Sequence, residues 1–186
     1  MSDQSLDDWY KTLQESQLTK RGLPPVEKWN PPLSGDIDIR ITRQGTWFHE
    51  GGEIKRQPLV TLFSSILKRE NDDYFLVTPE EKWRIAVDDV PFFFTELRVE
   101  HKGDTQALVF SSSTGDLVIA DQAHPLRVVV DGASGEPSPY VLLRGGMEGL
   151  LSRSVYYQLA DICETRKVDG KDVLGVSSMG CFFSLY

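Results

Sequence analysis

Short strand-like runs of apolar residues recur along most of the chain from residue 36 on, and some of them alternate with polar residues as half-buried β-strands do. The clearest case begins at Ile37, where Ile37, Ile39 and Ile41 alternate with Asp38 and Arg40. Further strand-like segments occur at 46–50, 53–56, 74–78, 83–88, 92–100, 106–111, 117–120, 125–130, 140–144, 173–176 and 181–186. The Gly51-Gly52 pair predicts a tight hairpin between two of them. The pattern therefore predicts a chain rich in β-sheet.

Apolar residues recur every three or four positions in three other segments, as in amphipathic helices. These segments are 5–20, 58–69 and about 147–162. Pro58 suits the first helical position, and Lys68 and Arg69 suit the negative carboxyl end of the second helix. The Gly145-Gly146 pair is expected to open the third helix.

The order of these elements predicts an α+β protein with three parts. Residues 1–34 hold the first helix and a strap with four prolines, which fix an extended backbone. Residues 35–92 form a first α+β domain, and residues 93–186 form a second, larger one.

The two domains share a short repeat. Segments 54–64 and 142–152 have the same order of apolar residue, any residue, Arg, two loop residues, apolar residue, two residues, Leu, apolar residue and Ser. A predicted hairpin precedes each segment. We infer a duplicated strand–turn–strand–helix unit, and two copies packed together would leave a cleft between them.

Composition narrows the classes of partner. The 186 residues include 20 basic and 28 acidic side chains, so the formal net charge is −8. A nucleic-acid backbone needs a basic face, and a membrane span needs about 20 consecutive apolar residues. The acidic N-terminus also lacks the pattern of a signal peptide. We expect a cytoplasmic protein with no membrane segment and no bulk nucleic-acid binding.

The residue types that usually carry catalysis are sparse. Cys163 and Cys181 are too few for a disulfide framework, and the three histidines lack the spacing of metal ligands. No phosphate-binding glycine loop and no G-x-S-x-G nucleophile motif occurs. We expect no enzyme activity, no metal and no cofactor.

Arg56 and Arg144 are the leading candidates for ligand binding, because each is expected between a strand and the first turn of a helix. The free N–H groups of a helix start and a guanidinium fork both favour phosphate or carboxylate. Gly145-Gly146 strengthens the second case, since no side chain would shield the amides. The alternative is that each arginine pairs with a nearby acid, such as Glu53 or Glu148, and ties a strand to a helix.

Three further residues complete the candidate site. His49 lies on a predicted strand of the first unit, and His124 lies near Arg127 at the start of a strand in the second. The alternative for each histidine is a hydrogen bond within a loop or turn.

Several motifs taken together resemble the bacterial domain-of-unknown-function 1285 (DUF1285) family. They are Gly45-x-Trp47-x-His49-x-Gly51, Ile54-x-Arg56, Leu-Phe-Ser-Ser-Ile-Leu-x-Arg69, Tyr74-x-Leu-Val-Thr-Pro79-x-Glu81, His124-Pro-Leu-Arg127 and Pro139-Tyr-Val-x-x-Arg144-Gly-Gly. The resemblance covers residues 20–186. It implies an α+β protein with an internal duplication, whose second domain is similar to the partly open pleckstrin-homology barrel. It also implies a nucleotide-like ligand between the domains and a role in signal transduction, without enzyme activity.

The sequence therefore supports two hypotheses. The first is a cytoplasmic regulatory module that binds a small anionic ligand between its halves, through Arg144, Gly145, Gly146, Arg56, His49, Arg127 and His124. The second is a protein–protein interaction or homo-oligomerisation module without a small ligand, which docks through the strap and the acidic surface.

Overall fold

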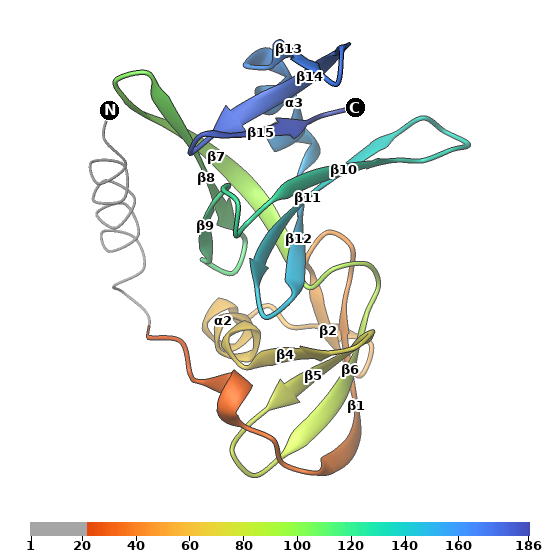
Figure 1. Cartoon of the computed structure of the whole chain (residues 1–186). Helices are drawn as coiled ribbons and strands as arrows, with labels where there is room; N and C mark the ends of the chain where they lie inside the picture. Colours follow the sequence, from red (N-terminus) through yellow and green to blue (C-terminus); the bar gives the residue numbers. More distant parts are fainter. Residues whose placement is uncertain (1–21) are drawn as a thin grey trace.

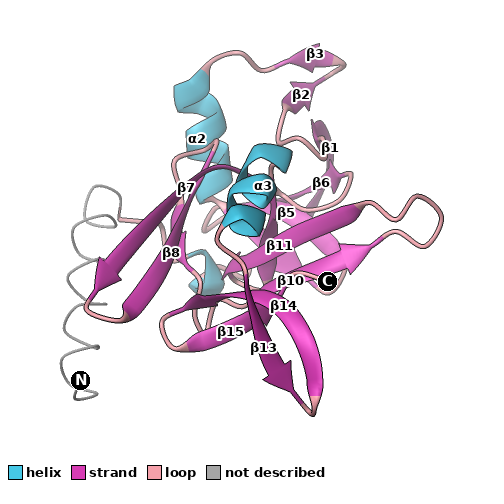
Figure 2. Ribbon diagram, turned by 90° about the horizontal axis from the view of Figure 1, so that it is seen from above, coloured by secondary structure: helices cyan, strands magenta, loops and turns pink. Residues whose placement is uncertain are grey.

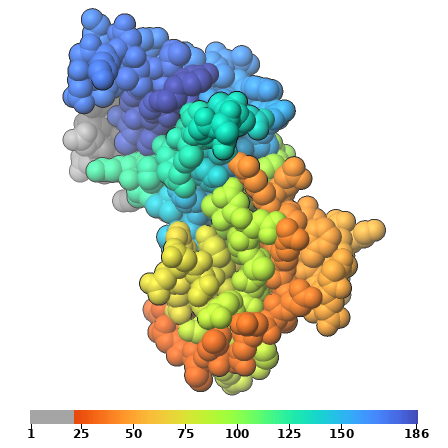
Figure 3. All heavy atoms as spheres, turned by 90° about the vertical axis from the view of Figure 1, so that its right-hand side faces the viewer, coloured from red at the N-terminus to blue at the C-terminus, as the bar shows by residue number. Residues whose placement is uncertain are grey.

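The computed structural model of the chain describes residues 22–186, which form two β-sheet domains joined at a narrow waist (Figures 1 and 3). The predicted helix at 5–20 lies outside the described residues. In the first domain a 3₁₀ turn and one helix accompany a six-stranded sheet, sheet A. The elements in chain order are η1 (Val26–Lys28), β1 (Leu33–Ile41), β2 (Trp47–His49), β3 (Gly52–Glu53), α2 (Gln57–Ser65), β4 (Leu67–Glu70), β5 (Asp73–Val77) and β6 (Lys82–Val87).

The second domain contains a six-stranded sheet B, one helix and a three-stranded sheet C. Sheet B holds β7 (Phe92–Lys102), β8 (Thr105–Ser112), β9 (Leu117–Ile119), β10 (Leu126–Val130), β11 (Pro137–Arg144) and β12 (Met147–Leu151). Helix α3 (Arg153–Asp161) leads to sheet C, which holds β13 (Glu164–Val168), β14 (Lys171–Ser178) and β15 (Cys181–Ser184). Sheet C lies across one end of sheet B, with β14 beside β8 and β15 beside β10 (Figures 1 and 2). The expected α+β class with a partly open barrel in the second domain is confirmed.

The two large sheets have the same topology, which confirms the internal duplication. Their strand orders are β3-β2-β1-β6-β5-β4 and β10-β11-β12-β7-β8-β9. Each sheet is two antiparallel three-stranded meanders joined by a parallel pairing of the first and last strands, β1 with β6 and β7 with β12. The sequence repeat, however, aligned the wrong segments. Arg56 follows the third strand of its sheet, whereas Arg144 is the last residue of the fifth.

The predicted helix at 58–69 is too long at its carboxyl end. Helix α2 ends at Ser65, and the next residues form β4, where Leu67 is fully buried and pairs with Leu76. Lys68 is buried as well, and its amine donates hydrogen bonds to the carbonyl oxygen of Trp29 at 3.0 Å and to Asn30 Oδ1 at 2.8 Å. These tertiary contacts outweigh the local helical pattern. They also hold the proline-rich strap against the sheet.

The predicted helix start at Gly145-Gly146 is wrong. Both glycines have positive φ, 56° and 70°, and form the turn of the β11–β12 hairpin, where such angles are required. Strand β12 has an apolar run like that of a buried helix, so periodicity alone does not separate the two. The helix begins only after Ser152, whose hydroxyl accepts a hydrogen bond from the N–H of Val155 at 3.2 Å.

Two smaller predictions also need correction. The β2–β3 turn is formed by Glu50 and Gly51, both at positive φ, so Gly52 already belongs to β3. Strand β13 was not predicted, because all of its side chains are exposed and no apolar alternation marks it.

One hydrophobic core runs through both domains. Ile41 and Trp47 of sheet A belong to the same buried cluster as Phe92, Phe94 and Phe110 of sheet B. Phe92 and Phe94 lie at the start of β7, directly after the chain leaves sheet A, and are almost completely buried. The waist is therefore a packed apolar junction, and we call this contact region between the domains the seam.

Gly149 in β12 allows the closest packing in this core. A Cβ atom at this position would lie 2.2 Å from Cε2 of Phe94, and 3.0 Å from Cβ of Phe92. We expect Gly149→Ala to lower the free energy of unfolding by about 1–3 kcal/mol, the usual cost of overpacking. Urea unfolding monitored by tryptophan fluorescence measures this change.

Gly132→Ala is the matched control, since nothing lies within 4 Å of a Cβ atom at that loop position. It should leave the unfolding midpoint nearly unchanged. Equal midpoints for the two variants would contradict the tight contact of β12 with Phe94.

Candidate functional site

Arg144 lies at the seam, where its donors bind groups of the protein itself. Its Nη1 donates a hydrogen bond to Asp116 Oδ1 at 2.5 Å, and its Nη2 donates to the carbonyl oxygen of Ser64 at 3.0 Å. The guanidinium also lies 4.7 Å from the ring centroid of Phe92. Ser64 belongs to the last turn of α2, where unpaired carbonyls favour a cation. Arg144 thus links the second domain to the carboxyl end of the helix in the first.

Asp116 is held in place by its own loop. Its Oδ2 accepts hydrogen bonds from the hydroxyls of Ser112 at 2.9 Å and Thr114 at 2.6 Å, and the side chain is only 10% exposed. The sequence suggested Glu148 as a carboxylate partner for Arg144. The actual partner is Asp116, in the turn between β8 and β9.

The amino end of α2 is bound to the same domain. Gln57 Nε2 donates a hydrogen bond to the carbonyl oxygen of Ser113 at 3.0 Å, in the turn that also carries Asp116. Contacts at both ends therefore fix α2 against the second domain.

The Gly145-Gly146 turn packs onto the first domain. The carbonyl oxygen of Gly146 accepts a hydrogen bond from Arg69 Nη1 at 2.8 Å. A Cβ atom at Gly145 would lie 2.8 Å from Glu27 Oε1 in η1. The helix amides that were expected to bind an anion here do not exist, because the turn connects two strands.

Arg127 is placed at the same seam by β10. Its Nε and Nη2 donate hydrogen bonds of 2.7 Å each to the two carboxylate oxygens of Glu148, and this bidentate pair raises the pKa of Arg127. The guanidinium also lies over the ring of Tyr140. The Tyr140 hydroxyl donates a hydrogen bond to Asp89 Oδ2 at 2.9 Å. The pKa of Tyr140 is raised, mainly because the side chain is partly buried and to a lesser extent because of the Asp89 carboxylate. Arg127 therefore also has a carboxylate partner within the protein.

The remaining predicted residues are spread over separate elements. Arg56 lies at the N-cap position of α2, as predicted, where its side chain is exposed and makes no capping hydrogen bond, and His49 is exposed on β2. His124 lies in the β9–β10 loop, where its ring Nδ1 is 3.0 Å from Asp121 Oδ1 and its backbone N–H donates a hydrogen bond to the same oxygen. The structure thus brings Arg144, Gly145, Gly146 and Arg127 to the seam, but it does not gather all seven residues at one site.

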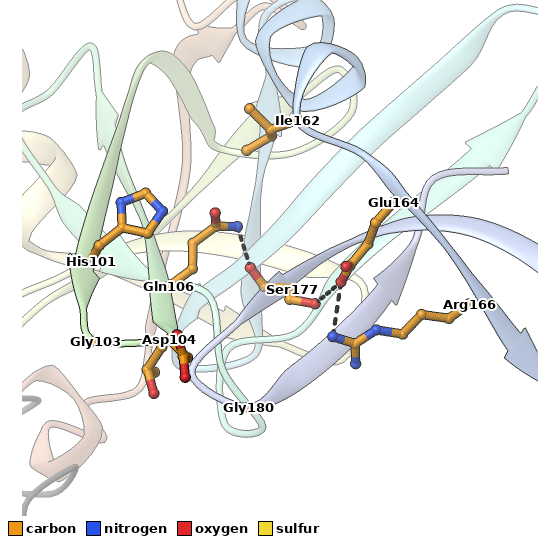
Figure 4. A pocket seen from close by; sticks show the side chains of 10 residues that line it. His101, Gly103, Asp104, Gln106, Ile162, Glu164, Arg166, Ser177 and Gly180 are labelled. Atoms are coloured by element: carbon orange, nitrogen blue, oxygen red, sulfur yellow. Dashed lines mark hydrogen bonds and ion pairs between the residues drawn. The ribbon is translucent and has the colours of Figure 1, made fainter. Parts of the chain in front are cut away.

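A different hollow, which the sequence analysis missed, lies in the second domain (Figure 4). We call it the rim pocket; its volume is about 470 Å³. Three segments meet there: the β7–β8 turn, the α3–β13 junction and the β14–β15 turn. The lining residues are His101, Gly103, Asp104, Thr105, Gln106, Ile162, Glu164, Arg166, Ser177 and Gly180.

Hydrogen bonds fix the walls of the rim pocket relative to one another. Gln106 Nε2 donates to the carbonyl oxygen of Ser177 at 2.8 Å, and the Ser177 hydroxyl donates to Glu164 Oε1 (Figure 4). Arg166 Nη2 lies 2.9 Å from the same Glu164 oxygen, and its guanidinium lies 5.0 Å from the ring centroid of Phe182. The pocket is therefore preformed, with a restrained guanidinium on one wall.

The strand register explains why the opposite wall is polar. His101 and Gln106 are directly opposed on β7 and β8, so they share one face of the sheet. Deeper along the same face, the opposed pair is Val99 and Leu108, which contributes to the core. The rim pocket thus lies at the polar mouth of the partly open barrel, a common place for small-molecule sites.

The described residues contain no group of three or more His, Cys, Asp or Glu side chains that could hold a metal ion. No helix within residues 22–186 is long and apolar enough to cross a membrane.

Comparison with known families agrees with this architecture. Residues 24–90 match the N-terminal domain described as "Domain of unknown function (DUF1285)", and residues 91–185 match the C-terminal domain described as "Protein of unknown function (DUF1285)". The chain belongs to the DUF1285 family. The resemblance found in the short motifs is therefore confirmed.

Two solved structures of DUF1285 proteins are similar to this chain. The one from Silicibacter pomeroyi DSS-3 is 47% identical with a TM-score of 0.82, and the match covers 89% of this chain and 88% of that chain. The one from Shewanella baltica OS155 is 28% identical with a TM-score of 0.52, and the match covers 66% of this chain and 90% of that chain. No curated protein matches the sequence.

The partners of Arg144 lead to a prediction for this DUF1285 protein. Arg144→Ala leaves the largely buried Asp116 without its cation and the last turn of α2 without a donor. We expect the free energy of unfolding to fall by about 2–4 kcal/mol, as when one partner of a buried pair is removed. Chemical unfolding measures the change.

Arg153→Ala tests whether any arginine pair would give this effect. Arg153 pairs with Glu136, but their side chains are 71% and 66% exposed, so we expect a loss below about 1 kcal/mol. Similar losses in both variants would mean that the seam pair has no special role.

Proposed function

We propose that this protein is a regulatory module that binds a small polar ligand in the rim pocket, within its C-terminal domain. The supporting observation is the convergence of three chain segments on one hollow whose walls are joined by the Gln106–Ser177–Glu164–Arg166 contacts. Its volume of about 470 Å³ lies within the usual range for small-molecule sites. The seam, by contrast, has its arginines paired with Asp116 and Glu148.

The lining indicates the chemistry of the ligand. Arg166 offers a planar, permanently charged fork that suits a carboxylate or a phosphate, and it shares that fork with Glu164. His101 and Gln106 supply hydrogen-bonding groups on the facing wall, while Ile162 supplies an apolar contact. The proposed ligand is a small anion with a polar body, of nucleotide size or smaller.

The proposal includes no reaction, in keeping with a sequence that lacks the nucleophile and metal motifs considered above. It also places the protein in the cytoplasm, where the half-buried thiols of Cys163 and Cys181 would stay reduced. The alternative role is that of an interaction module without a small ligand, which docks through the proline-rich strap and the acidic surface.

The test is a thermal-shift screen of the full chain with carboxylated and phosphorylated metabolites, nucleotides included. A bound ligand stabilises the folded state, so a true ligand raises the melting temperature. We expect Arg166→Gln to abolish most of that rise. If no compound in the panel stabilises the wild type, the proposal fails.

Arg98→Gln is the matched control. Arg98 also pairs with a glutamate two residues away, at 2.6 Å from Glu100, and its side chain is 54% exposed against 48% for Arg166. It lies on the face of β7 opposite to His101. The ligand-induced shift should survive this change. A shift lost in Arg56→Ala but kept in Arg166→Gln would move the site away from the rim pocket.

A further inference from the structure

The charges that line the rim pocket require more of a ligand than a negative charge. Asp104 and Glu164 are formally negative, and Arg166 is the one lining side chain with a permanent positive charge. The whole chain has a formal net charge of −8 as well. A carboxylate or phosphate that enters the pocket therefore meets like charges, and a cationic group on the same ligand would offset their repulsion.

Glu164 offers an acceptor to such a cationic group. The Ser177 hydroxyl and Arg166 Nη2 both contact Oε1 of this carboxylate. Within residues 22–186 both contacts thus use the same oxygen, which leaves Oε2 to accept a hydrogen bond from a ligand. The Glu164 side chain is 46% exposed, so this oxygen is accessible from the pocket.

Gln106 presents a second acceptor on the facing wall. The carbonyl oxygen of Ser177 can only accept, so the amide nitrogen of Gln106 must face it, and the two atoms are 2.8 Å apart. The amide oxygen is then directed away from Ser177, toward the side of His101 and Ile162 (Figure 4). This oxygen also needs a donor, and a ligand ammonium supplies one.

Arg166 supplies the donors for the acid group of the ligand. Its guanidinium lies 5.0 Å from the ring centroid of Phe182. Gly175 makes room for that ring, because a Cβ atom at this position would lie 2.6 Å from Cζ of Phe182. The guanidinium is therefore held in place, and the N–H groups that do not face Glu164 can bind a carboxylate.

The contact between Glu164 and Arg166 places an anion and a cation side by side, 2.9 Å apart. An α-amino acid has the matching arrangement, since its ammonium and its carboxylate are attached to the same carbon. A ligand with only an acid group would leave the acceptors of Glu164 and Gln106 without a donor. A ligand with only an amine would leave the guanidinium without an acceptor.

We propose that the ligand of the rim pocket is an amino acid, whose carboxylate binds Arg166 and whose ammonium binds Glu164. This inference rests on the proposed function, and it narrows the ligand to an acid that carries an amino group beside it. The amide oxygen of Gln106 adds a second acceptor for the ammonium, and Asp104 adds negative charge to the lining. Ile162 provides an apolar contact for the side chain of the ligand.

Thermal-shift measurements on the full chain test this assignment with matched compounds. The standard L-amino acids form the panel, and each is compared with the 2-hydroxy acid and the amine that have the same side chain. For L-alanine these are lactate and ethylamine. We expect at least one amino acid to raise the melting temperature, and its hydroxy acid and its amine to lose most of that rise.

Glu164→Gln removes the negative charge but keeps an oxygen that accepts from Ser177 and Arg166. In calorimetric titrations it should weaken binding of the amino acid about tenfold or more, and it should leave binding of the hydroxy acid unchanged or stronger. Glu100→Gln is the matched control, because Glu100 also pairs with an arginine, Arg98, at 2.6 Å and lies outside the pocket lining. This variant should keep the wild-type affinity.

The possible results distinguish this inference from the proposed function. If carboxylates or phosphorylated compounds stabilise the wild type and amino acids do not, the inference is overturned and the rim pocket remains a ligand site. The same holds if the hydroxy acid or the amine binds as tightly as the amino acid, or if Glu164→Gln binds the amino acid as the wild type does. If no compound of either panel binds, the inference and the proposed function both fail.

Discussion

The guanidinium of Arg144 is the contact on which the arrangement of the two domains depends. It lies between the Asp116 carboxylate and the last-turn carbonyl of Ser64, with its face against Phe92. The buried carboxylate needs a cation and the carbonyl needs a donor, and the two come from different parts of the chain. Together with the core shared across the waist, this contact makes the seam a packed junction.

The duplication explains why the two domains can have different roles. Both sheets have the same strand order, but the helix is inserted between the meanders in sheet A and follows them in sheet B. In the first domain that helix, α2, fills the seam. In the second, α3 leads into sheet C, and the added strands close part of the barrel and create the walls of the rim pocket. The hollow therefore arises where the second copy departs from the first.

Much of the fold was predictable from the sequence, and the errors have identifiable causes. The pattern of apolar residues, alternating in β1 and forming short runs between turns later in the chain, located β1 and most later strands. The pattern failed for β12, where residues on both faces are buried, and for β13, which is exposed on both faces. It also failed at Lys68, whose burial depends on acceptors from Trp29 and Asn30 far along the chain.

The candidate site was harder to predict than the fold. Sequence order suggested that Arg144 precedes a helix and pairs locally, but its partner Asp116 lies across the sheet. The rim pocket combines residues from the β7–β8, α3–β13 and β14–β15 junctions, and no local pattern brings these together. The spacing of Glu164 and Arg166 on one face of an unrecognised strand was the only local signal of that wall.

Differential scanning calorimetry of the wild-type chain tests the packed seam most directly. A seam with a shared core and the Arg144 contacts makes the two domains one cooperative unit. The account predicts a single endotherm whose calorimetric enthalpy equals its van't Hoff enthalpy. Two separable endotherms, one for each domain, would contradict it.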